Sequence, residues 1–126
     1  MNSVKVARLL QFLVVSGCVA CGGSSPNNPT PIATSTITLT AAGASPKNIS
    51  VALGTRVLFI NNDSRSHNMT SDPHPEHDEC PEINQIGFLQ PGEKRETGNL
   101  VIVRSCGFHD HDNPAATTLQ GTIAIK

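Results

Sequence analysis

The β character of the chain is clearest in residues 48–60, which read Asn-Ile-Ser-Val-Ala-Leu-Gly-Thr-Arg-Val-Leu-Phe-Ile. Two apolar runs meet there at a Gly-Thr turn. The first run alternates apolar and polar residues, as a half-buried strand does, and the second is more continuously apolar, as in a more deeply buried strand. Further runs of this kind occupy residues 35–40, 66–71, 100–104 and 121–125. Since no segment sustains the apolar spacing of an amphipathic helix, we predict an all-β fold, a Greek-key β-sandwich of about seven to eight strands.

The overall composition excludes several classes of function. The chain of 126 residues carries nine Lys and Arg against ten Asp and Glu, for a formal net charge of -1. It therefore lacks the basic excess that a nucleic-acid partner requires. Only 3% of its residues are aromatic, so a stacking surface for bases or sugars is not expected. No nucleophile with a paired base, phosphate-binding glycine loop or zinc-protease helix is found, and we expect neither an enzyme nor a small-molecule substrate.

The amino-terminal residues are typical of an export signal. Lys5 and Arg8 precede an apolar run over residues 9–15, which is too short for a stable membrane anchor. The run ends in Val15-Ser-Gly-Cys18, which resembles a bacterial lipobox with Cys18 as the lipidated residue. An ordinary signal peptide cleaved nearby is the alternative.

Three segments follow from this interpretation. We predict a lipoprotein signal peptide over 1–17, a flexible tether rich in Gly, Ser, Pro and Asn over 18–34, and a single domain over 35–126. The domain is expected to be exported and attached to a membrane through the lipid on Cys18. Because Val19 rather than Asp follows that cysteine, we expect the outer membrane of a two-membrane cell, with the domain facing the periplasm or the exterior.

The histidines are confined to two segments that we expect to be loops. Each segment follows an apolar run, and if the runs at 56–61 and 100–105 point the same way, both segments would lie at one pole of the sandwich. Cys80 ends the first loop and Cys106 begins the second. The first loop contains His67, His74 and His77, and the second contains His109 and His111.

The spacing of Cys106 and His109 predicts a metal site. A thiolate and an imidazole three residues apart across a turn can reach the same ion, and His67 would join them from the other loop. Two imidazole nitrogens and a thiolate suit copper, with zinc second, and they suit neither magnesium nor calcium. A site of this kind favours electron transfer, because little movement is needed when the ion changes oxidation state.

Two segments resemble the plastocyanin-like cupredoxins, the type 1 blue-copper family. The first is residues 59–68, an aromatic-containing strand followed by Asn-Asn and a His-Asn pair. The second is Ser-Cys-Gly-Phe-His at 105–109, followed by Gly in the last alternating run at 119–125. The resemblance implies an eight-stranded Greek-key sandwich, one copper on His67, Cys106 and His109, and electron transfer to a redox partner protein. Leu119 stands where the family has its axial Met.

A competing interpretation rests on Cys80. In an oxidising compartment a Cys80–Cys106 disulfide would consume the thiolate, and copper would then meet only imidazoles and carboxylates. The protein would be a copper-handling or structural cupredoxin-like module with a His-rich metal site. The segment from His74 to Glu79 could capture a cation or dock a partner, or it could be a solvated loop. His111 could replace His109, bind a second ion or be solvated.

Overall fold

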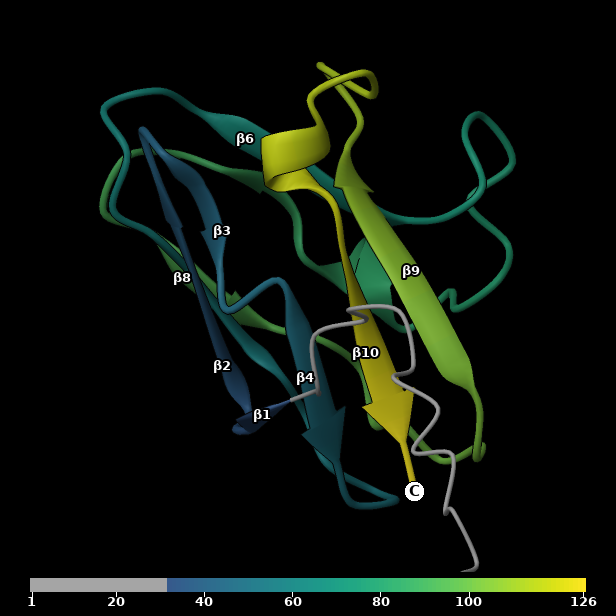
Figure 1. The fold of residues 1–126 in the computed structure, drawn as a ribbon. Coiled ribbons are helices and arrows are strands. Elements are labelled where there is room, and N and C mark those ends of the chain that lie inside the picture. Colours follow the sequence, from purple (N-terminus) through teal and green to yellow (C-terminus); the bar gives the residue numbers. More distant parts are fainter. Residues whose placement is uncertain (1–31) are drawn as a thin grey trace, which may run out of the picture.

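The computed structural model describes residues 32–126, which form two β-sheets packed into a sandwich (Figure 1). The larger sheet contains, in spatial order, β1 (Ile32–Ala33), β4 (Asn48–Val51), β10 (Gly121–Ile125), β9 (Ser105–Asp110), β6 (His67–Ser71) and β7 (Gly87–Leu89). The smaller sheet contains β3 (Gly43–Ser45), β2 (Thr36–Thr40), β5 (Leu58–Asn61) and β8 (Lys94–Glu96). The predicted all-β sandwich is confirmed. The predicted signal peptide and most of the tether lie outside the described residues.

Two short 3-10 helices complete the described elements, η1 (Ile83–Gln85) in the segment after β6 and η2 (Thr117–Leu119) before β10. Within the described part of the chain, no helix has the length and apolar character needed to cross a membrane.

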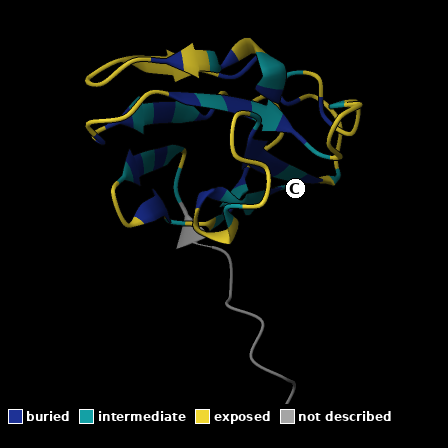
Figure 2. Ribbon diagram, turned by 90° about the horizontal axis from the view of Figure 1, so that it is seen from above, coloured by how far each residue is buried: buried dark blue, intermediate teal, exposed yellow. Residues whose placement is uncertain are grey.

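The core lies between the sheets and follows the period-two pattern of the sequence (Figure 2). Ile37 of β2 and Ile123 of β10 are fully buried, as alternation predicts for residues on the inner face of a sheet. The rings of Phe59 and Phe108 join the two sheets at the centre, with centroids 5.4 Å apart and an interplanar angle of 89°. Edge-to-face pairs of this kind stabilise a core beyond the area that they bury.

The expected strand over residues 100–104 is absent from the structure. Leu100 is buried, and its backbone is bonded to the turn at Gly54 and Thr55. The three β-branched residues after Leu100 are more than half exposed, namely Val101, Ile102 and Val103. The paired strand starts only at Ser105 because its register is set by β10, whose Ile123 lies opposite Cys106. Cys106 and His109 therefore belong to a strand and not to a loop, which changes the site fundamentally.

Candidate metal centre

Four histidines from two segments converge beside β9. His109 lies within β9 and His111 directly after it, while His74 and His77 belong to the segment 72–82 that follows β6. In Figure 1 this segment runs alongside β9, on the right. Each ring offers one nitrogen, and these four atoms all lie within 4.8 Å of one another. The ring centroids of the neighbouring pairs are 4.9 to 5.5 Å apart.

The alternation of β9 explains why the cluster lies on the outer face of the larger sheet. Cys106 and Phe108 belong to the hydrophobic core, so Gly107 and His109 project from the opposite face of the strand. His109 is nevertheless only 2% exposed, because segment 72–82 covers it. The cluster thus lies between the outer face of a sheet and a loop, not between the two sheets.

The backbone of His77 is fixed by two hydrogen bonds. Its N–H donates to the carbonyl of Pro73 at 2.7 Å, and its own carbonyl accepts from the Asn84 side-chain amide at 2.8 Å. Its φ angle of 54° lies in the left-handed region, which is costly for a residue with a side chain. Such a conformation persists only where the surroundings impose it, and it is frequent at functional sites.

Hydrogen bonds orient three of the rings. His77 Nδ1 donates to the carbonyl oxygen of Ser71 at 2.9 Å, so the Nε2 of His77 is an acceptor. His109 Nδ1 lies 2.6 Å from the Asp72 carboxylate, so its Nε2 is the nitrogen left to bind a metal. This Nε2 lies 3.4 Å from the Thr70 hydroxyl. His111 Nδ1 lies 2.9 Å from His77 Nε2. A carbonyl or carboxylate partner behind each ring is the usual support of metal-binding histidines.

The Asp72 carboxylate reaches His109 because residue 107 is a glycine. A Cβ at Gly107 would overlap the Asp72 carboxylate, whose place beside the ring would then be lost. The backbone of the same glycine accepts from the Asp72 N–H at 3.1 Å and donates to the Glu79 carboxylate at 2.7 Å. These contacts attach both ends of the histidine-bearing segment to β9.

His74 differs from the other three histidines, because its side chain is exposed. The surrounding rings partly desolvate it and so lower its pKa, and positive charge on His111, His77 and His109 lowers the pKa further. The neutral form, which is the form that binds a metal, is thereby favoured.

The donor set fits a transition-metal ion. Four imidazole nitrogens suit copper, zinc or nickel, and they do not suit magnesium or calcium. Nitrogens on opposite sides of one ion are about 4.2 Å apart, since each bond is about 2.1 Å long. The four ring nitrogens of the cluster lie within 4.8 Å of one another. Only a small inward movement of the rings is therefore needed to bring opposite nitrogens to about 4.2 Å.

The structure does not bring the predicted set of His67, Cys106 and His109 together. Cys106 is bonded to Cys80, with Cα atoms 5.8 Å apart, and both residues are fully buried. Its sulfur is therefore not a free thiolate, as the competing interpretation expected. The sulfur also lies on the core face of β9, whereas His109 projects from the other face. Leu119, the residue aligned with the axial Met, is a buried member of the core.

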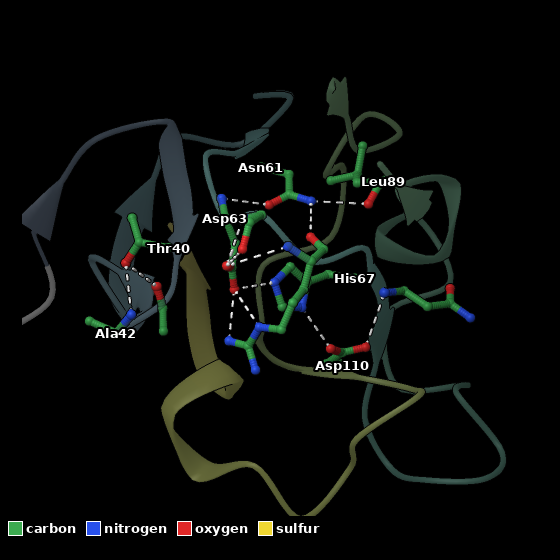
Figure 3. A network of polar contacts seen from close by, with 11 residues as sticks. Thr40, Ala42, Asn61, Asp63, His67, Leu89 and Asp110 are labelled. Carbon is green, nitrogen blue, oxygen red and sulfur yellow. Dashed lines mark hydrogen bonds and ion pairs between the residues drawn. The ribbon is translucent and has the colours of Figure 1, made fainter. Parts of the chain in front are cut away.

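His67 belongs to a separate polar network with Asp63 and Asp110 at one end of the sandwich (Figure 3). Its Nε2 lies 3.1 Å from the Asp63 carboxylate and its Nδ1 lies 2.9 Å from the Asp110 carboxylate, so neither nitrogen is free for a metal. Asp63 also pairs with Arg65 at 2.7 Å. The hydrogen bond from Arg65, assisted by those from His67 and the backbone, outweighs burial and holds the pKa of Asp63 well below its usual range. The network closes the pole where the predicted site would have been.

Comparison with known proteins identifies the fold. No family model matches the chain, and no curated protein matches it. Solved structures do match, and they define the fold as that of the cupredoxins.

A purple cupredoxin from Nitrosopumilus maritimus is similar with a TM-score of 0.57 and 19% identity, over 74% of this chain and 100% of that one. Plastocyanin from Dryopteris crassirhizoma has a TM-score of 0.56 and 17% identity, over 72% and 99% of the two chains. A copper-containing nitrite reductase from Thermus scotoductus SA-01 has a TM-score of 0.54 and 19% identity, over 82% of this chain and 24% of that one. The predicted resemblance to plastocyanin-like cupredoxins is confirmed at the level of the fold.

Proposed function

We propose that this domain binds copper through the four-histidine cluster of His74, His77, His109 and His111, and that it handles copper outside the cytoplasm. The observation that carries the proposal is the convergence of four ring nitrogens within 4.8 Å of one another. The rings of His77 and His109 are also oriented by hydrogen bonds to the Ser71 carbonyl and the Asp72 carboxylate. Copper is preferred because Cu²⁺ stands above zinc and nickel in affinity for imidazole sites. The cupredoxin-like fold agrees with this choice, since similar structures include a copper-containing enzyme.

The disulfide supports copper handling over electron transfer through a thiolate-ligated ion. Cys106 is the only cysteine of the predicted site, and its sulfur is engaged with Cys80. Electron transfer to a redox partner protein is the second candidate, because plastocyanin with a similar fold is known in an oxidized form. It would have to use an ion held by imidazoles alone.

We also propose export and attachment through lipid on Cys18. The buried disulfide supports an oxidising compartment, where such bonds form and persist. Fractionation of cells that express the chain, combined with labelling by a fatty-acid analogue, tests this proposal. Soluble cytoplasmic protein without label would contradict it, and a Cys18→Ser variant should lose the label.

Metal titration of the full chain tests the copper proposal. One Cu²⁺ should bind per chain in competition with a chelator, and its electron paramagnetic resonance spectrum should show coupling to imidazole nitrogens. The visible absorption should be weak, because no thiolate contributes an intense charge-transfer band. A strong band that disappears in a Cys106→Ser variant would instead establish the thiolate site.

Two histidine variants separate the cluster from the polar network. His109→Ala removes a buried member of the cluster and should weaken copper binding by more than the 10- to 100-fold that loss of a supporting residue usually costs. His67→Gln is the matched control, since His67 already has a carboxylate at each nitrogen. Circular dichroism checks that both variants are folded. Equal losses in the two variants would contradict the assignment.

A further inference from the structure

We propose that His74 is the exchangeable ligand of the cluster, and that an imidazole side chain of a partner protein takes its place when the metal is passed on. This inference rests on the proposed copper site and names the step by which that site would release its ion. The other three histidines would form a fixed set that keeps hold of the ion during the exchange.

The contacts of the rings divide the cluster into fixed and free members. His77 is fixed by the Ser71 carbonyl and His109 by the Asp72 carboxylate. His111 is fixed through its backbone, whose N–H donates to the Asn68 carbonyl at 2.7 Å. Among the side-chain hydrogen bonds of residues 32–126, none involves His74, whose ring lies beside the other three rings at centroid distances of 5.1 to 5.5 Å.

Exposure points to the same residue. His109 is buried and His77 and His111 are partly buried, whereas His74 is exposed to solvent. Pro73, Pro75 and Glu76, which flank it, are exposed as well. A partner can therefore approach the cluster at His74 without opening the fold, while the other three rings are screened by the sheet and by segment 72–82.

The exchange is balanced without electron or proton transfer. The incoming neutral imidazole forms one nitrogen–metal bond, and the bond from His74 breaks. The oxidation state of the ion is unchanged, and the released His74 ring stays neutral.

Free imidazole serves as the probe for the exchange, with the full chain and a matched pair of variants. His74→Ala should still bind Cu²⁺, with about a tenfold loss of affinity, and added imidazole should bind at the vacated position and restore the wild-type paramagnetic resonance spectrum. His77→Ala removes a fixed ring and should lower the affinity for Cu²⁺ by more than a hundredfold. This loss exceeds the 10- to 100-fold that removal of a supporting residue usually costs. Imidazole should not restore its spectrum. Because His74 is exposed, its replacement should leave the circular dichroism unchanged.

The outcomes distinguish the two proposals. If the wild-type chain binds no copper, the proposed function itself fails. If the wild-type chain binds copper but His74→Ala loses as much affinity as His77→Ala, or if imidazole leaves the spectrum of His74→Ala unchanged, His74 is not the exchangeable ligand. Restoration of both variants by imidazole would also overturn the inference, since the four rings would then be equivalent.

Discussion

Replacement of both Cys80 and Cys106 by alanine should reduce the free energy of unfolding by about 3.5 kcal/mol. The disulfide joins residues separated by 26 positions, and closing a loop of that length removes about this much conformational entropy from the unfolded chain. A small domain has a total stability of about 5–15 kcal/mol, so the variant should fold but with a reduced margin. The melting temperature should fall by roughly 14–28 °C, at about 4–8 °C for each kcal/mol in a domain of this size.

Urea and thermal unfolding followed by far-ultraviolet circular dichroism measure this change, since the chain has no Trp or Tyr for intrinsic fluorescence. Wild-type protein unfolded in the presence of a thiol reductant is the control, because it has the same side chains without the bond. A loss below about 1 kcal/mol, together with maleimide labelling of Cys80 and Cys106 in the denatured, unreduced wild type, would contradict this prediction.

Three further predictions concern other parts of the molecule. Gly107→Ala should displace the Asp72 carboxylate and weaken copper binding by about 10- to 100-fold in a chelator competition, with little change in circular dichroism. Asp63→Asn should lower the free energy of unfolding at neutral pH. As the pH falls into the acid range, this free energy should decrease less in the variant than in the wild type. Because pairing with Arg65 lowers the folded-state pKa of Asp63, this carboxylate stabilises the fold above pH 4 and the contribution is lost as pH falls further, as urea unfolding at stepped pH values would show. Phe59→Ala should cost about 3–5 kcal/mol in urea unfolding, since it empties a fully buried ring site.

The fold could be predicted from the sequence where alternation and burial coincide. The runs at 35–40, 48–53 and 121–125 became β2, β4 and β10 because each has one apolar face that the core requires. The run at 100–104 failed because its β-branched residues carry the local signature of a strand without a partner to pair with. Hydrogen bonding to β6 and β10, which no local pattern reveals, fixed β9 at 105–110 instead.

That shift of a few residues also decided the site. With Cys106 at the start of a loop, its sulfur and His109 can meet, but in a continuous strand the two residues project from opposite faces. The spacing of His109 and His111, two residues apart, was the available signal, because in an extended chain it places both rings on one face. The path of segment 72–82 depends on the contacts of Asp72 and His77 and on the disulfide, and these long-range contacts leave no local trace in the sequence.

The disulfide also separates two tasks within one small chain. It ties the histidine-bearing loop to the core face of β9, the strand that carries His109 on its outer face. Evolution, or an engineer, can therefore change the composition of the loop to select a different ion without repacking the sandwich.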